Sequence, residues 1–259
     1  MASHLIQGRT VDMPVRVRDA EICSVSYPVR ADAARAVIAY SGLDVAEVLP
    51  GKAVCMLLFV DYRDGDLDTY HEFGMAFLVR PPGAGMDPQR SEDIHPGTPS
   101  LARPKRVGGG GLRDLRQAGV FVHWLPVDQR FTLEAGRTLW GFPKELADIE
   151  LRLDSPYKRC VLRKDGRLVL DLLVKPGVPV PGATAMTPMD AYTHREGVTR
   201  RVPWSLRVRG ARMRPGGALI RLGNHPVAKE LSELGLPKRA LFTTTVSRAE
   251  MVFGEAAEI

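Results

Sequence analysis

A lysine that follows a helix-stopping sequence is the residue in this chain best suited to covalent chemistry. Lys144 comes directly after Gly141-Phe142-Pro143, and the large rings of Trp140 and Phe142 lie beside it in the sequence. Such a corner is expected to be rigid and poorly hydrated. A lysine in water titrates near about 10.4, and loss of hydration lowers a lysine pKa because it disfavours the ammonium. A neutral amine can attack a ketone and form a Schiff base, so Lys144 is the candidate nucleophile. The alternative is a surface lysine beside a helix end.

An alternating stretch from 68 to 80 supplies the next candidates. Its period of two predicts a strand with two different faces. One face carries Tyr70, Glu72, Gly74, Ala76 and Leu78, and the other carries His71, Phe73, Met75, Phe77 and Val79. The second face is typical of a core, whereas the first is mixed, with small residues above which a cavity can open.

Glu72 and Tyr70 on the mixed face are candidates for handling protons and substrate oxygens. A glutamate on a half-apolar strand is costly to bury unless it is hydrogen-bonded or functional. Glu72 can protonate or deprotonate the carbon beside an imine, or orient a water. Tyr70 can donate a hydrogen bond to a substrate oxygen. The alternative for both residues is a solvent-facing strand edge.

Arg137 and Glu145 flank the lysine corner. Arg137 either clamps a substrate carboxylate or ties the end of the preceding helix. Glu145 is adjacent to Lys144, so in an extended segment the two side chains point to opposite sides. An inward-facing Glu145 would favour the ammonium and oppose nucleophilic attack. Desolvation by Trp140 and Phe142 must then activate the lysine.

The elements that must position these residues are mostly strands. The patterns predict strands at 20–27, 53–62, 68–80, 119–127, 146–153, 159–163, 167–174, 199–214, 218–222 and 239–253. They predict helices at 30–40, at 129–140 with Asp128 as its cap, and at 226–234 with Asn224 as its cap. The stretch 176–188 resembles a linker, and 81–111 is a Pro- and Gly-rich loop insertion, either a lid or a segment without a role.

Many closely spaced strands with three short helices indicate an α+β fold with a mainly antiparallel sheet. We expect one domain over 1–259, with a barrel-like or cone-shaped sheet enclosing a pocket. No repeat of solenoid period is visible.

Composition excludes several classes of function. The net charge is +6, but the arginines are spread along the chain, so we expect no nucleic-acid partner; an anionic substrate would be attracted by the same field. Three widely spaced cysteines fit a reduced compartment with buried thiols. No apolar run reaches the length of a membrane span or a signal peptide, so we expect a cytoplasmic protein without a membrane partner. The scattered histidines predict no metal site, and the glycine run 108–111 lacks a dinucleotide-binding pattern, so no cofactor is expected.

The lysine corner and the residues before it resemble a known catalytic segment. Residues 135–144 read Ala-Gly-Arg-Thr-Leu-Trp-Gly-Phe-Pro-Lys. This run resembles the segment of the acetoacetate decarboxylase family in which a Gly-Arg-Glu turn leads into an aromatic-Pro-Lys corner with the Schiff-base lysine; acetoacetate decarboxylase is a known example of an activated lysine. Tyr70-His71-Glu72 is similar to a Tyr-x-Glu segment whose glutamate lies in the family's active site. The stretches 223–226 and 235–238 are similar to its C-terminal helix and exit. The resemblance covers about 27–253 and implies a β-rich cone around an internal pocket.

Several positions depart from the family pattern. Thr138 stands where the family usually has glutamate, and Glu145 replaces a second lysine. The acidic residue expected in the preceding strand is missing, because 54–60 is apolar throughout. For the family's N-terminal arginine, Arg16 and Arg18 are nearby candidates. These changes remove parts associated with acetoacetate decarboxylation but leave the imine-forming lysine.

The resemblance therefore implies a Schiff-base-forming lyase, a carboxy-lyase acting on a β-keto acid or a related keto acid through an imine on Lys144. Aldolase or dehydratase chemistry on a 2-oxo acid by the same imine is the near alternative, and a non-catalytic small-molecule binding protein is the other. The expected site comprises catalytic Lys144 and Glu72 and substrate-binding Tyr70, Trp140, Phe142 and Arg137. We also expect a homo-oligomer.

Overall fold

The structure is a computed structural model, and it describes residues 2–80, 118–181 and 185–259. The predicted loop insertion at 81–111 lies outside these residues. The helices are α1 (Ala31–Ile38), the short 3-10 helix η1 (Ala39–Ser41), α3 (Arg130–Trp140) and α4 (Pro226–Glu233). None of them combines the length and hydrophobicity that crossing a bilayer requires.

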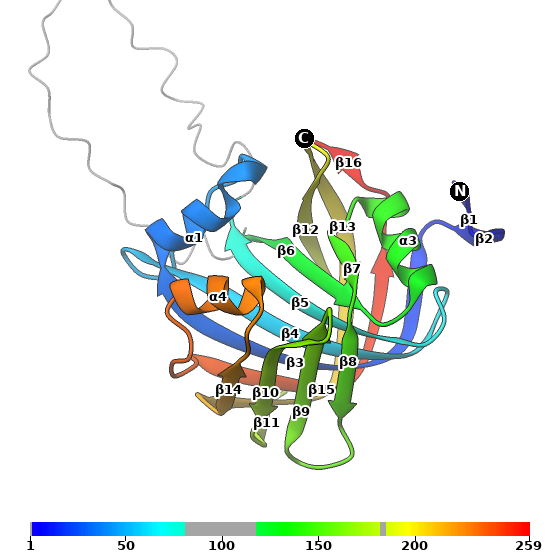
Figure 1. Ribbon diagram of the computed structural model, residues 1–259. Coiled ribbons are helices and arrows are strands. Elements are labelled where there is room, and N and C mark those ends of the chain that lie inside the picture. The colour runs from blue at the N-terminus through cyan, green and yellow to red at the C-terminus, as the bar shows by residue number, and fades with distance from the viewer. Residues whose placement is uncertain (1, 81–117, 182–184) are drawn as a thin grey trace, which may run out of the picture.

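Strands make up most of the described chain (Figure 1). They are β1 (Ser3–Ile6), β2 (Arg9–Asp12), β3 (Val15–Arg30), β4 (Lys52–Gly65), β5 (Tyr70–Val79), β6 (Gly119–Val127), β7 (Lys144–Leu146), β8 (Asp148–Arg152), β9 (Lys158–Lys164), β10 (Arg167–Val174), β11 (Val178–Pro179), β12 (Thr187–Arg195), β13 (Val198–Pro215), β14 (Ala218–Leu222), β15 (Phe242–Phe253) and β16 (Ala257–Glu258).

The largest sheet closes on itself. Its strands pair in the order β13-β12-β6-β5-β4-β3-β15, and β15 also pairs with β13, which completes a ring. Most neighbours are antiparallel, while β12 and β7 both run parallel to β6, along different parts of it. A closed ring leaves each of its strands with partners on both sides and creates an interior. The expected mainly antiparallel α+β fold with a cone-shaped sheet is confirmed.

A smaller sheet lies against the outside of this ring. Its order is β14-β10-β9-β8, and it lies below α4 in the view of Figure 1. One apolar core lies between the outer face of β3 to β6, the smaller sheet, α1 and α4. The three cysteines lie in this core, so the prediction of buried thiols is confirmed, and burial raises the pKa of each thiol.

The alternation predicted for β5 appears in the packing. Phe73, Met75, Phe77 and Val79 lie in the outer core. Tyr70, Glu72, Gly74, Ala76 and Leu78 instead face the interior of the ring. His71 departs from the prediction, because it is half-exposed and its Nδ1 lies 3.0 Å from a carboxylate oxygen of Asp128.

Other local predictions need correction. Asp128 does not cap α3: one of its carboxylate oxygens accepts the backbone N–H of His71, and Gln129 occupies the N-cap position without a side-chain cap. The N-cap of α4 is His225, whose Nδ1 accepts from the Val227 N–H, and not Asn224. The linker-like stretch 176–188 contains β11 and the start of β12, and the hairpin β1–β2 was not predicted.

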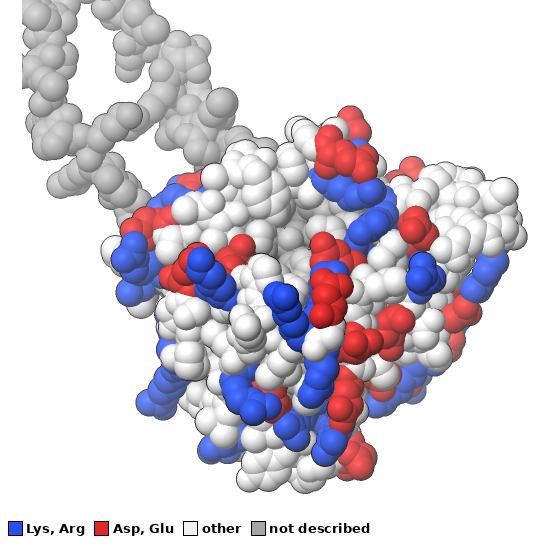
Figure 2. All heavy atoms as spheres, in the orientation of Figure 1, with Lys and Arg blue, Asp and Glu red and all other residues white. Residues whose placement is uncertain are grey.

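Charges of both signs are interleaved on the surface. On the face shown in Figure 2, acidic and basic side chains alternate over β8 to β10 and the ends of the helices. Arg159, for example, makes two hydrogen bonds to Asp171. The excess of positive charge is therefore not gathered into one patch on this face.

Candidate active site

The C-terminus of α3 delivers Lys144 to a fixed point. Gly141 ends the helix in the left-handed conformation (φ +69°), and its N–H donates to the Arg137 carbonyl. Pro143 has no N–H to continue the helix, and Lys144 then begins β7, paired with Leu125 of β6. The predicted corner is thus present at the predicted residues.

Arg137 fastens this corner from the helix side. Its Nε donates to the backbone carbonyl of Lys144 at 2.8 Å. The guanidinium does not belong to the lining of the interior cavity. Of the two roles considered for Arg137, this contact corresponds to tying the helix end.

The amine of Lys144 is buried against a carboxylate. Only 3% of Lys144 and 6% of Glu72 is exposed, and Nζ of Lys144 lies 2.8 Å from Oε2 of Glu72. The two residues come together because β5, β6 and β7 are neighbours, with Glu72 opposite Val127 and Lys144 opposite Leu125. Glu145 points away, where it accepts from the indole of Trp124. The carboxylate beside the lysine is therefore Glu72.

Two tyrosines complete the polar wall. The hydroxyl of Tyr62 donates to Oε1 of Glu72 at 2.9 Å, so both oxygens of this carboxylate are engaged. The rings of Tyr62 and Tyr70 stack with centroids 4.2 Å apart, and Nζ of Lys144 lies 5.0 Å from the centroid of Tyr70. Burial, followed by the charge of Glu72, raises the pKa of both hydroxyls well above the usual value. Both tyrosines therefore remain protonated donors at neutral pH.

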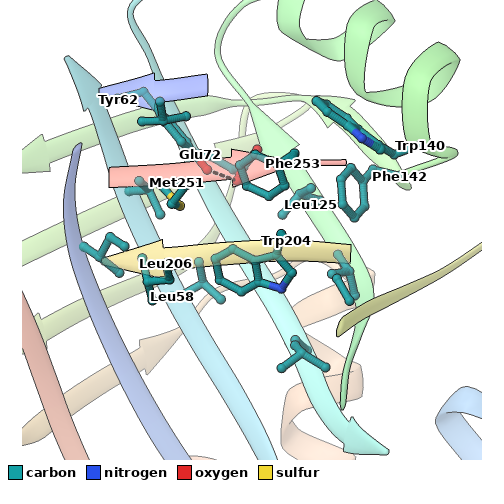
Figure 3. A pocket seen from close by; sticks show the side chains of 18 of the residues that line it. Leu58, Tyr62, Glu72, Leu125, Trp140, Phe142, Trp204, Leu206, Met251 and Phe253 are labelled. Atoms are coloured by element: carbon teal, nitrogen blue, oxygen red, sulfur yellow. Dashed lines mark hydrogen bonds between the residues drawn. The ribbon is translucent and has the colours of Figure 1, made fainter. Parts of the chain in front are cut away.

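These groups form one wall of an apolar cavity inside the ring (Figure 3). Its volume is about 310 Å³, and every strand of the ring contributes to its lining. The lining includes Trp140 and Phe142 as predicted, together with Leu58, Leu125, Trp204, Leu206, Met251 and Phe253. Among the lining residues, all within the described ranges, Lys144 is the one Lys or Arg. The N-terminal candidates Arg16 and Arg18 do not line this cavity; they lie around a second cleft, which shares Val17 and Met251 with it.

The ring of Trp140 is held in place by the C-terminal part of the chain. The indole N–H of Trp140 donates to the carbonyl of Gly254 at 2.8 Å, and its ring packs beside Phe253. Phe142 lies 5.7 Å from Trp140 between ring centroids. Phe253 of β15 and the adjacent Gly254 therefore fix the position of Trp140, one of the two rings expected to exclude water from Lys144.

Sequence reasoning missed Tyr62 and the lining residues of β13 and β15. Tyr62 ends an apolar run, and its pairing with Tyr70 across β4 and β5 is what places its hydroxyl at Glu72. The hairpin from β4 to β5 carried a usable signal, because residues directly opposite in such a pair share a face. No local pattern indicates that Trp204 and Met251 reach the same cavity.

In the described part of the chain, no three His, Cys, Asp or Glu residues converge in a way that could hold a metal ion. Beside the amine of Lys144, the groups available for chemistry are the carboxylate of Glu72 and two phenols; Asp68 also lines the cavity but is paired with Arg9. This set can form an imine and transfer protons at the carbons beside it.

Comparison with known proteins places this chain in a family. The sequence matches the family model of acetoacetate decarboxylase (ADC) over residues 6–257. Comparison with curated protein sequences finds no match.

Solved structures share the fold at low sequence identity. The acetoacetate decarboxylase from Legionella pneumophila is 16% identical with a TM-score of 0.64, over 97% of this chain and 90% of that chain. An acetoacetate decarboxylase-like enzyme from Sphingomonas wittichii is 16% identical with a TM-score of 0.59, over 100% and 99%. The enduracididine biosynthesis enzyme MppR, complexed with the condensation product of pyruvate and imidazole 4-carboxaldehyde, is 14% identical with a TM-score of 0.56, over 96% and 90%. Because the family match includes β5, the α3 corner and the strands that close the ring, the chain belongs to the acetoacetate decarboxylase family.

Proposed function

We propose that this protein is a lyase that forms a Schiff base between Lys144 and a keto acid, and that it releases carbon dioxide from a β-keto acid. The observation that carries the proposal is the buried contact between Lys144 and Glu72 on the wall of an apolar cavity. A buried ion pair is weak evidence for stability, because desolvation offsets the attraction. Its position in a cavity large enough for a small molecule supports a chemical role.

The carboxylate of Glu72 stabilises the ammonium of Lys144 in the resting site, and the same carboxylate is the base placed to remove its proton. Glu72 accepts a proton from the ammonium of Lys144 across 2.8 Å, and the amine then attacks the substrate carbonyl carbon. The carbonyl oxygen becomes a hydroxyl as the nitrogen loses a proton. Glu72 returns its proton to that hydroxyl, which leaves as water, and a protonated imine and an ionised Glu72 remain.

The imine then accepts the electrons of the breaking bond. The bond to the β-carboxylate breaks, carbon dioxide leaves, and its electron pair becomes the enamine. A proton taken up from solvent and passed on by Glu72 is added to the enamine carbon, and water hydrolyses the imine to release the ketone and Lys144. Carbon dioxide is neutral, whereas the carboxylate is charged, so the apolar lining favours the product side of this step over the substrate side.

Tyr62 supports Glu72 throughout these steps. Its hydroxyl keeps Oε1 occupied, so Oε2 remains directed at the lysine. The second phenol, on Tyr70, stacks on Tyr62 and faces the ammonium. Tyr70, whose hydroxyl is not engaged by Glu72, is the phenol left to donate to a substrate oxygen once the lysine is covalently occupied.

Aldolase or dehydratase chemistry is the second candidate. The observation that favours it is the single carboxylate, with two phenols, beside the amine; this set is suited to moving protons at the carbon next to an imine. The fold relative MppR was solved with a condensation product of pyruvate and an aldehyde. In this reading, Glu72 removes a proton from the methyl group of a pyruvate imine, and the enamine attacks the aldehyde.

Borohydride reduction tests the imine directly. Reduction in the presence of acetoacetate or pyruvate is expected to add the ligand, or its decarboxylated ketone, to the peptide that contains Lys144. Lys144→Ala must abolish the adduct. Carbon dioxide release from β-keto acids then distinguishes the decarboxylase from the aldolase, which instead gives a Lys144-dependent product from pyruvate and an aldehyde. Binding without any adduct across both panels would indicate a non-catalytic binding protein.

A further inference from the structure

The chamber beyond the polar wall is the feature that the proposed chemistry leaves unused. Acetoacetate places only a methyl group on the far side of its carbonyl, yet the cavity continues along β5 away from Lys144. We propose that the keto substrate carries an apolar chain or an aromatic ring that fills this chamber. This inference rests on the proposed function, since it assumes that the carbonyl is held at Lys144.

The direction of the chamber follows from the register of β5. Its cavity-facing residues run from Glu72 through Gly74 and Ala76 to Leu78. At about 3.3 Å per residue, this face is roughly 20 Å long. The polar groups, Tyr70 and Glu72, stand at one end of the row. The substrate carbonyl therefore lies at that end and its remainder points toward Leu78.

The walls beside this row are aliphatic. On β4, Met56 and Leu58 flank it, and on β6, Val120 and Val122 do so. Figure 3 shows Leu58 and Leu206 on the side of the cavity away from Trp140 and Phe142. The side chains on β4 and β6 that flank the row offer no partner to a charged or strongly polar tail, and burying one against them is unfavourable. An alkyl chain or an aromatic ring suits it.

Two small residues keep the chamber open. A Cβ on Gly74 would lie 3.1 Å from Cγ and Cδ2 of Leu58 and 3.3 Å from Cδ1 of Leu125. Even a methyl group at this position would therefore crowd the side chains of Leu58 and Leu125. Ala76 is the next cavity-facing residue, opposite Met56 in the register with β4. Larger residues at these two positions would separate the Lys144 end from the Leu78 end. The chamber thus depends on residue size at Gly74 and Ala76.

The expected preference can be estimated from transfer energies. Each buried methylene contributes about 0.8 kcal/mol, which is about fourfold in affinity. Extending acetoacetate to 3-oxooctanoate adds methylenes that fit along the row. We expect the half-saturating concentration of 3-oxooctanoate to be lower than that of acetoacetate by a factor on the order of a hundred. The half-saturating concentration of benzoylacetate should also be lower than that of acetoacetate.

The experiment measures borohydride trapping at Lys144 as a function of concentration for acetoacetate, 3-oxooctanoate and benzoylacetate with the full chain. The readout is the ratio of trapping efficiency for the long substrate to that for acetoacetate. Ala76→Leu places a branched side chain in the chamber and is expected to lower this ratio at least tenfold. Val122→Phe fills the chamber from the opposite wall and should lower it as well. Thermal melting establishes that each variant is folded.

Ala257→Leu is the matched control, because it makes the same change at an exposed position on β16 outside the lining. It should leave the ratio unaltered. Equal trapping of short and long substrates by the unmodified protein, or a ratio that Ala76→Leu and Val122→Phe do not change, overturns the inference while the Schiff-base proposal stands. Absence of an adduct with every keto acid overturns the proposed function and with it the inference.

Discussion

Gly136 lies so close to Lys144 that no side chain fits between them. A Cβ on Gly136 would be 2.5 Å from Cδ and 2.6 Å from Cε of the lysine. The last turn of α3 therefore forms a surface along which the aliphatic part of Lys144 runs before its amine reaches Glu72. The glycine of the corner motif sets the path of the Lys144 side chain.

Gly136→Ala is expected to separate activity from stability. Alanine stabilises a helix interior by roughly 0.5–1 kcal/mol over glycine, but here its methyl group displaces the lysine stem. A displacement of this kind can cost about a hundredfold in rate, so imine trapping should fall strongly while the melting temperature is maintained. Thr138→Ala, at an exposed position on the same helix, is the control and should leave trapping unaltered. Full trapping by Gly136→Ala would mean that the lysine path is not set here.

Glu72→Gln is expected to slow both the formation of the trapped adduct and the overall turnover. The amide keeps the shape of the side chain but cannot carry protons between the amine, the departing water and the substrate carbon. Loss of a general acid–base group costs about 10²–10⁴-fold. Steady-state product formation and single-turnover borohydride trapping measure the two stages separately. An unchanged product rate would remove Glu72 from the mechanism.

The Lys144–Glu72 pair is expected to contribute to chemistry and not to net stability. Lys144→Met leaves Glu72 buried without its cation, which should destabilise the protein by about 3–5 kcal/mol. The double variant Lys144→Met/Glu72→Leu replaces both charges by apolar groups and should recover most of this loss. Urea unfolding of the two single variants and the double variant gives the comparison. A double variant as unstable as the worse single one would contradict this account.

Tyr62→Phe is expected to reduce turnover by about 10–100-fold, because a hydrogen bond to a charged group contributes about 1.5–3 kcal/mol. The raised pKa of Tyr62 keeps its hydroxyl protonated, so the unmodified enzyme should show no loss of this contact as the pH rises through the usual range of tyrosine. The decisive readout is the dependence of turnover on pH, which should change in Tyr62→Phe if the hydroxyl orients Glu72. Val60 lies on the same strand, lines the cavity and has no hydroxyl. The variant Val60→Ala therefore tests whether the loss of any side-chain atoms on this wall changes turnover in the same way.

His71 should make stability depend on pH. Its hydrogen bond to Asp128 raises the pKa of His71 above the usual value of about 6.5, so the folded state binds the proton more tightly than the unfolded state. This contribution is fully present below about pH 6.5 and is lost as the pH rises through the raised pKa of the folded state. The difference in unfolding free energy between the unmodified protein and His71→Gln should therefore be larger near about pH 6 than near about pH 9. Because His71 is half-exposed, we expect a difference of less than about 1 kcal/mol. A difference of the opposite sign would contradict the assignment.

The parts of the site that could be predicted are those encoded by local spacing. The alternation of β5 placed Glu72 on the cavity face, and Gly141 with Pro143 located the corner that presents Lys144. Both signals act within a few residues, where backbone geometry determines which way a side chain points. His71 did not follow the core pattern because the carboxylate of Asp128, just before α3, offers its ring a partner near the beginning of β5.

The remaining parts depend on pairings between distant segments. Tyr62 faces Glu72 because β4 and β5 pair in one register, and a shift of one residue would turn its hydroxyl away. β12 escaped prediction because Pro188 and the mixed pattern of 187–195 resemble a loop; the strand is defined by its pairing with β13. Trp204 and Met251 line the cavity only because β13 and β15 close the ring.

The closure of the ring by β15 has a consequence for how the protein folds. β15 pairs with β3, more than two hundred residues earlier in the chain, and also with β13. Pairings between such distant segments form late and slowly, because the entropy of closing a long loop is lost before the new contacts stabilise the chain. Until then, the aliphatic faces of β4 and β5 have no cover and are exposed to association with other chains. The lysine acquires its dry surroundings only when this strand docks, so a nascent chain that already contains the whole corner still lacks the environment that the proposed imine chemistry needs.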